Sequence, residues 1–377
     1  MEVNKKIALA KEASKFITAH VSNIWPGFTP IPFIIYDDVS QVAVGAKWPE
    51  RYTRYEDGIW VAYGHDPELF ANTVIGYHGI PVAIWDTRTW PDSPKISHVA
   101  GSIAHEMFHS FQHAFKCPGP NDLILPQYPH SKHSVSLVIE ENQLLTQIVA
   151  NPSFARECIE KIIALRKQRE MEIGADFMEY DTGCESYEGT SAYVEIKMEA
   201  LVEGITAFEA VTRSVYAPFI KESGEILNRY RARCYVSGLI LCLALDAIWP
   251  KWQASWQESG KTIYDWIKDN LTLTESEVTA SPANLKTAHE LLIAYENEKE
   301  QKINDFLNQP LTSFEDDVKV TLFDPMNLVC ANNRCLHKHG KIKLGEKEQM
   351  VTEPFLVEYG DNILDVKRIL IPNAAIE

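Results

Sequence analysis

The segment 105–109 reads His-Glu-Met-Phe-His and constrains the fold of this chain more than any other stretch. Two histidines four residues apart lie on one face of a helix, where both imidazoles can bind one zinc ion, and Glu106 between them faces the same pocket. The Asp-Ser-Pro sequence at 92–94 suits a helix start, and the Cys-Pro-Gly-Pro sequence at 117–120 prevents continuation. We therefore predict a helix over about residues 94–116.

The surroundings of this motif favour a metal site over a chance match. Apolar residues fall on several faces of the predicted helix, which is typical of a helix buried inside a domain. A strand-like apolar run at 79–86 precedes the helix. A single buried histidine is more often a hydrogen-bonded core residue than a ligand, but His98, His105, His109 and His113 share one stripe. We expect this stripe to line a pocket.

Composition limits the partners of the protein. The chain has 36 Lys+Arg against 52 Asp+Glu, a net charge of −16, which repels nucleic-acid phosphates and anionic lipid surfaces. The N-terminal segment lacks the apolar centre of a secretory signal. The longest apolar stretch, 235–249, contains Asp246 and is shorter than the ~20 residues that cross a bilayer. We expect no nucleic-acid partner and no membrane span.

The cysteines bear on location and on a second metal. Seven cysteines, an odd number spread along the chain, indicate free thiols of a reducing compartment, and so predict a cytoplasmic protein. Four potential ligands, Cys330, Cys335, His337 and His339, lie close together and are candidates for a second metal ion. Their spacing fits no common zinc finger, so we predict a metal-free, reduced turn between two strands.

The order of segments predicts an α+β protein in three parts. Residues 1–120 would form an N-terminal antiparallel sheet and the zinc helix, residues 121–309 a mainly helical subdomain carrying the third ligand, and residues 310–377 a small β-rich C-terminal module. No internal repeat or low-complexity linker separates them, so we expect close packing. An edge strand beside the pocket would accept an extended peptide as one more strand; the alternative is a sheet that only supports the helix.

Two histidines leave a zinc ion in need of a third protein ligand. In this respect the sequence resembles the gluzincin branch of the HExxH zinc metallopeptidases, the thermolysin-like and aminopeptidase-like enzymes, over about 79–116 and 183–202. The resemblance implies a zincin-like fold, one zinc ion per chain, and Glu188 as third ligand. The spacer of 78 residues after His109 is longer than in the best-known members, and no Gly-Ala-Met-Glu-Asn stretch precedes the helix. An aminopeptidase assignment therefore does not follow.

Glu185 and Glu195 are alternatives to Glu188. Glu185 lies one turn earlier on the same face of the predicted helix, and Glu195 lies ~10 Å further along its axis. We favour Glu188 because Gly189 directly after it allows this helix to approach the zinc helix at that level. Glu195 then suits a hydrogen bond to the free N–H of a histidine.

The predicted activity is zinc-dependent hydrolysis of peptide bonds in a peptide or protein substrate. Zinc lowers the pKa of a bound water to about 7, and Glu106 acts as the general base that passes its proton to the departing amine. Gluzincins often add a Tyr or His that stabilises the oxyanion, for which Tyr235 is the candidate; His113 lies too far along the helix to be a ligand. The alternatives are a catalytically inactive zincin-fold scaffold and a zinc hydrolase of a non-peptide amide.

Overall fold

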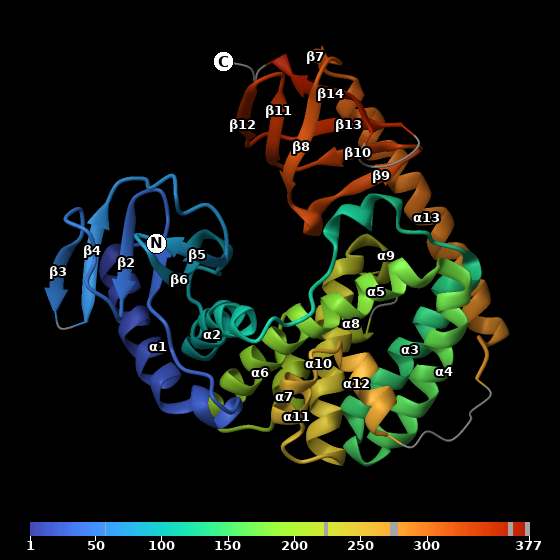
Figure 1. Ribbon diagram of the computed structural model, residues 1–377, viewed down its shortest axis with the longest axis horizontal. Coiled ribbons are helices and arrows are strands. Elements are labelled where there is room, and N and C mark those ends of the chain that lie inside the picture. The colour runs from blue at the N-terminus through green and yellow to red at the C-terminus, as the bar shows by residue number, and fades with distance from the viewer. Residues whose placement is uncertain (57, 222–224, 272–277, 361–364, 374–377) are drawn as a thin grey trace.

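The computed structural model describes residues 1–56, 58–221, 225–271, 278–360 and 365–373. An N-terminal part, a helical part and a C-terminal module follow one another around a central gap (Figure 1). The helices are α1 (Val3–Ile24), α2 (Ile96–Ala114), α3 (Lys132–Ala150), α4 (Ala155–Ile173), α5 (Ala175–Cys184), α6 (Thr190–Glu203), α7 (Ala207–Arg213), α8 (Ala217–Lys221), α9 (Glu225–Asn228), α10 (Tyr230–Ile248), α11 (Trp252–Ser259), α12 (Ile263–Asn270) and α13 (Pro282–Leu307).

Three sheets accompany these helices, so the protein is α+β as predicted. The strands are β1 (Phe33–Tyr36), β2 (Ser40–Val44), β3 (Thr53–Glu56), β4 (Ile59–Tyr63), β5 (Thr73–Tyr77), β6 (Ile80–Asp86), β7 (Leu311–Phe314), β8 (Val318–Phe323), β9 (Val329–Ala331), β10 (Arg334–His337), β11 (Gly340–Leu344), β12 (Lys347–Val351), β13 (Phe355–Tyr359) and β14 (Val366–Pro372).

The N-terminal sheet has the strand order β3-β4-β2-β1-β6-β5. Every neighbouring pair is antiparallel except β1 and β6, which confirms the mostly antiparallel sheet. Helices α1 and α2 pack against it, and Ile35, Val42 and Ala83 of the sheet share one apolar core with both helices. Strand β5 is an edge strand, contacts α2 and lies on the side of the sheet that borders the central gap (Figure 1).

Helix α2 carries the histidine motif and is buried along most of its length, as predicted. It begins at Ile96 and ends at Ala114, two residues inside each predicted end. The predicted cap is not used, because the N-cap position is Lys95, which makes no side-chain capping hydrogen bond. Asp92 and Ser93 lie before the helix and accept hydrogen bonds from Lys5 of α1.

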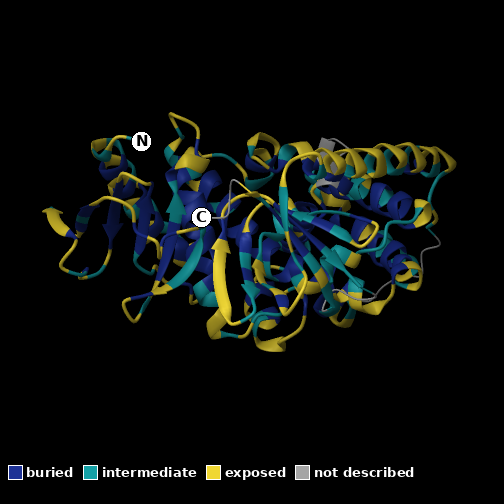
Figure 2. Cartoon of the chain, turned by 90° about the horizontal axis from the view of Figure 1, so that it is seen from above, coloured by how far each residue is buried: buried dark blue, intermediate teal, exposed yellow. Residues whose placement is uncertain are grey.

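The main core joins α2 to the helical part. Helix α6 packs along α2, and α10 packs on α6. Trp25, which is fully buried, contacts Phe108 of α2 and Trp252 of α11, with ring centroids 4.8 and 5.4 Å apart. Buried residues fill the interior, and exposed residues lie along turns and outer faces (Figure 2). The helical part and the N-terminal part therefore share one continuous apolar core.

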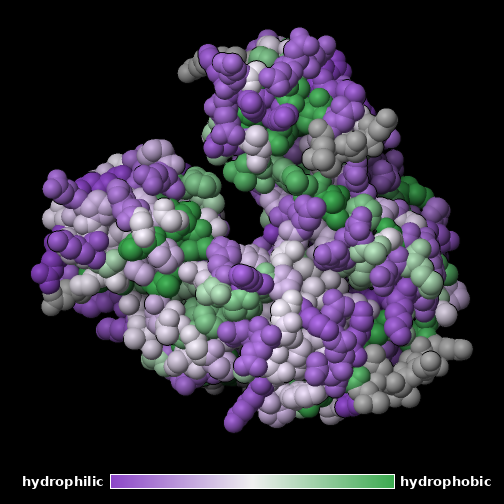
Figure 3. All heavy atoms as spheres, viewed as in Figure 1, coloured by the Kyte–Doolittle hydropathy of each residue, from purple (hydrophilic) through white to green (hydrophobic). Residues whose placement is uncertain are grey.

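The C-terminal module is β-rich, as predicted. One sheet has the order β7-β14-β13-β10-β9, the other the order β12-β11-β8. The long helix α13 connects it to the helical part and also contacts β9 and β10. A deep notch opens between this module and the N-terminal part (Figure 3). Among the helices that the structure describes, none has the length and apolarity of a membrane span.

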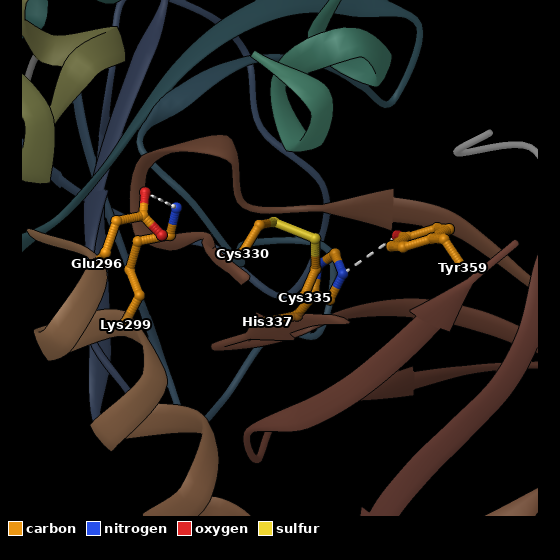
Figure 4. Close-up of a disulfide and its surroundings, with 6 residues drawn as sticks. All are labelled: Glu296, Lys299, Cys330, Cys335, His337 and Tyr359. Carbon is orange, nitrogen blue, oxygen red and sulfur yellow. Dashed lines mark hydrogen bonds and ion pairs between the residues drawn. A yellow bond between two sulfur atoms is a disulfide. The ribbon is translucent and has the colours of Figure 1, made fainter. Parts of the chain in front are cut away.

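The cysteine and histidine cluster of the module differs from the sequence-based prediction in one respect. Cys330 and Cys335 do flank a turn between two strands, but they form a disulfide instead of two thiols (Figure 4). The reason is the hairpin register, which places the two residues directly opposite each other. Burial lowers the pKa of His337 to about 3, and its ring stacks on Phe355. Within the described residues, this cluster is not among the groups that could hold a metal ion.

Candidate metal centre

Helix α2 and the π-helical segment Glu185–Gly189 that precedes α6 bring three potential zinc ligands together. The ligand atoms of His105, His109 and Glu188 all lie within 4.8 Å of one another, and all three residues are buried. Oε2 of Glu188 is 3.6 Å from Nε2 of His105 and 3.5 Å from Nε2 of His109. Zinc bonds of ~2.0–2.1 Å in a tetrahedral arrangement separate ligand atoms by ~3.3 Å. The three residues, called the metal cluster below, are therefore close enough together to hold one metal ion such as zinc.

A π-helical turn positions Glu188. Helix α5 continues through the π-helix Glu185–Gly189 into α6, and such turns are frequent at functional sites. Glu185 faces away from the histidines, because Arg166 donates to its two carboxylate oxygens at 2.7 and 2.6 Å. Ser237 also donates to Glu185, at 2.5 Å. The structure thus brings Glu188, and not Glu185, to the histidine pair.

The predicted role of Gly189 is wrong. A Cβ on Gly189 would lie 2.5 Å from the Cα of Gly238, so this glycine allows α10 to approach, and not the zinc helix. The glycine between α2 and α6 is Gly101, whose Cβ would meet the backbone oxygen of Glu195 at 3.0 Å. The sequence pattern identified a close approach correctly but could not identify the neighbouring helix.

Each imidazole of the cluster is held through its other nitrogen. Glu195 lies 3.1 Å from Nδ1 of His105, as its predicted role requires. Oε1 of Gln112 lies 2.7 Å from Nδ1 of His109, while its Nε2 donates to the backbone oxygen of Tyr187. Because both partners accept, both Nδ1 atoms carry the proton and the Nε2 lone pairs face Glu188. Such outer contacts fix the ring orientation at zinc sites.

This donor arrangement fits a cation between the three residues. Two imidazole lone pairs facing a carboxylate oxygen repel it unless a proton or a metal ion lies between them. Burial acts to lower the pKa of His105, but hydrogen bonds with Glu188 and Glu195 outweigh it and raise that pKa to about 10. A cation bound between the three residues would relieve this repulsion, and zinc binding would release any proton held there.

Two further side chains complete the pocket. Glu106 is buried, with Oε2 3.9 Å from Nε2 of His109, and burial raises its pKa. The ring of Tyr235 stacks on His105 with centroids 6.1 Å apart. Burial and the charge of Glu188 raise the pKa of Tyr235, so its hydroxyl stays protonated and able to donate. Arg231 donates to Oε1 of Glu188 at 2.8 Å, which leaves Oε2 directed at the histidines.

His113 is not part of the metal cluster, as predicted. It is exposed, and its Nε2 lies 2.8 Å from the hydroxyl of Tyr187. The ring of Tyr187 in turn stacks on His109, with centroids 4.5 Å apart and an interplanar angle of 13°. His113 and Tyr187 therefore line the outer rim of the site.

A second group of potential ligands lies behind the first. His98, Glu195 and Glu199 have ligand atoms within 4.8 Å of one another. His98 already contacts Glu199 at 3.0 Å, and Tyr216 donates to Glu195 at 2.6 Å. These contacts make the second group a hydrogen-bonded layer that supports His105.

Sequence reasoning missed Gln112, Arg231 and Tyr216. Gln112 follows His109 by three residues on the same helix face, a spacing that indicates a local partner. Arg231 and Tyr216 come from distant segments and have no such signal.

Comparison with known proteins adds no family to this geometry: no family model, no curated protein and no solved structure matches the chain.

Proposed function

We propose that this protein is a zinc-dependent metallopeptidase with a zincin-like, gluzincin-type site. The observation that carries the proposal is the convergence of two Nε2 atoms and one carboxylate at zinc-ligand spacing, beside a buried glutamate. Because His105, His109 and Glu188 provide three ligands, a fourth position is left for water or substrate, which is typical of catalytic zinc sites and not of structural ones.

Zinc bound to the cluster would polarise a substrate carbonyl and lower the pKa of a water molecule to about 7. Glu106 would accept the proton of the attacking water and deliver it to the nitrogen of the departing amine. Its raised pKa suits this exchange, because a base whose pKa is nearer neutrality both accepts and releases a proton readily. Tyr235 would donate a hydrogen bond to the oxyanion that forms on the attacked carbonyl.

An extended peptide is the substrate class that the surroundings favour. The edge strand β5 borders the gap and contacts α2, so its free backbone groups are available to pair with a peptide in the notch. The notch is open at the top (Figure 3), which admits a long chain more readily than an enclosed cavity does. A non-peptide amide remains the alternative substrate.

A scaffold without turnover is the alternative from another class. Glu106 is neither a predicted ligand nor paired with a lysine or arginine in any ion pair of the described residues. A buried carboxylate costs free energy when it has no cationic partner, so a protein that only keeps the fold has no use for it. Five free cysteines support the proposed cytoplasmic location, whereas the disulfide between Cys330 and Cys335 is unusual for that compartment.

Metal analysis and a peptide-library digest test the proposal together. We expect one zinc ion per chain, cleavage of peptides by the parent, and a 10²- to 10⁴-fold loss of turnover in Glu106→Gln with zinc retained. Glu290→Gln is the control, since this glutamate is exposed on α13. Zinc binding without cleavage would identify a scaffold, and cleavage of small amides alone would identify the non-peptide hydrolase.

A further inference from the structure

A small pocket lies between the C-terminal module and the helical part. Its volume is about 60 Å³, and it is formed by the loop before α3, the start of α10, the middle of α13 and the segment 325–330 of the module. The residues that matter for its chemistry are Tyr128, Arg229, Arg231, Tyr295, Lys299 and Cys330. We call this space the basic pocket.

The charge of the basic pocket is opposite to that of the chain. Arg229, Arg231 and Lys299 line it, and no aspartate or glutamate is among the described residues that do. The whole chain carries a net charge of −16. An anion approaching the protein is therefore repelled by most of the surface and attracted to this place.

Lys299 is available for such an anion. Its side chain is only 13% exposed, and burial lowers its pKa, because the ammonium has lost much of its water. Its partner is Glu296 of the same helix, whose Oε1 lies 3.6 Å from Nζ of Lys299 and whose side chain is 54% exposed. Both residues lie near the disulfide (Figure 4). Arg231 is already bound by two carboxylates, from Glu188 and Asp122. Arg229 lies over the ring of Phe219 at 5.0 Å and Lys299 over the ring of Tyr295 at 4.3 Å, contacts that leave the N–H groups of both cations able to donate to a ligand.

Helix α10 connects the basic pocket to the metal cluster. Tyr235 stacks on His105, Arg231 binds Glu188, and Arg229 lines the pocket at the other end of the same segment. Six residues of helix from Arg229 to Tyr235 span ~9 Å. An extended peptide covers ~3.3 Å per residue, so about three residues of substrate would span the axial distance between these two positions.

We propose that the basic pocket binds a carboxylate of the peptide substrate, either the C-terminal carboxylate or an acidic side chain about three residues from the scissile bond. The inference rests on the proposed peptidase function and names its substrate class. Charge-assisted hydrogen bonds from Arg229 and Lys299 would hold the carboxylate, and the tyrosine rings would cover the adjoining apolar chain.

The test measures peptide binding by calorimetry to the zinc-loaded Glu106→Gln protein, whose zinc content is determined first. Three versions of one peptide are compared: a free C-terminal acid, its amide, and the amide with one glutamate replacing a glutamine. We expect at least one acidic version to bind about ten- to hundredfold more tightly than the neutral amide. Lys299→Gln and Arg229→Gln should each remove most of that preference.

Lys302→Gln is the matched control, because Lys302 is exposed on the same helix and paired with Glu298. It should keep the preference. Preference for the free acid identifies the C-terminus, and preference for glutamate identifies a side chain. Three results would overturn the inference. They are equal binding of all peptide versions, an unchanged acidic preference in both variants, and stronger competition by inorganic phosphate than by acetate. Absence of zinc from the parent would instead overturn the proposed function.

Discussion

Glu195 lies 3.1 Å from Nδ1 of His105, on the opposite side of the imidazole from Glu188. The contact fixes both the tautomer and the orientation of a proposed ligand, and Tyr216 fixes Glu195 in turn. We therefore expect Glu195→Ala to lower zinc affinity by about 10- to 100-fold, the usual effect of removing such a partner. Competition with a chromophoric chelator measures this. Unchanged affinity would show that His105 is held by packing alone.

Glu188 and Glu185 should differ in their effects on metal and on stability. Glu188→Ala removes a proposed ligand, so we expect protein with little zinc. Glu185→Gln leaves the guanidinium of Arg166 without one of its two carboxylates, and we expect a loss of about 3 kcal/mol in the free energy of unfolding with zinc retained. Elemental analysis and urea denaturation of both variants separate the two roles. Zinc-replete Glu188→Ala would remove this residue from the site.

Gly238→Ala should destabilise the protein by displacing the π-helical turn that carries Glu188. The new Cβ would lie 2.8 Å from the Cα of Gly189, and backbone cannot yield as a side-chain end does. We expect a loss of about 1–3 kcal/mol in the free energy of unfolding and weaker zinc binding, because the π-helical turn would have to move. Gly76→Ala is the control, since no atom lies within 4 Å of its added Cβ. Equal stability of the two variants would contradict the proposed packing constraint.

The free energy of unfolding should fall at acid pH, because Glu141 becomes protonated and loses its interactions with the arginines around it. Burial acts to raise the pKa of Glu141, but Arg166, Arg233 and Arg169 outweigh it and hold the pKa well below its usual value of 4.5. A lowered folded-state pKa means that the stabilisation is complete above the unfolded-state pKa and is lost as the pH falls toward the folded one. Urea denaturation between pH 7 and about pH 3 should therefore show declining stability. Glu141→Gln should be less stable at pH 7 and show a smaller decline.

Much of the candidate site was predictable from the sequence because it is local. Helix periodicity alone places His105 and His109 on one face with Glu106 beside them, and the turn between β9 and β10 follows from polar residues between short apolar runs. Strands β2, β3 and β5 were not predicted, since they are short and their apolar patterns are weak. The disulfide was not predicted either, because it depends on the register of a hairpin.

The identity of the third ligand shows what the tertiary structure decided. In an uninterrupted α-helix Glu185 and Glu188 would share a face, so helix geometry left both open. The π-helical turn adds a residue to one turn and changes the direction of every side chain after it. That turn packs on α10, where Gly189 meets Gly238, while Arg166 of α4 and Ser237 of α10 hold the carboxylate of Glu185. The sequence alone determined the histidine pair and its glutamate, because their spacing is set within one helix. Only contacts between distant segments decided which acid faces them.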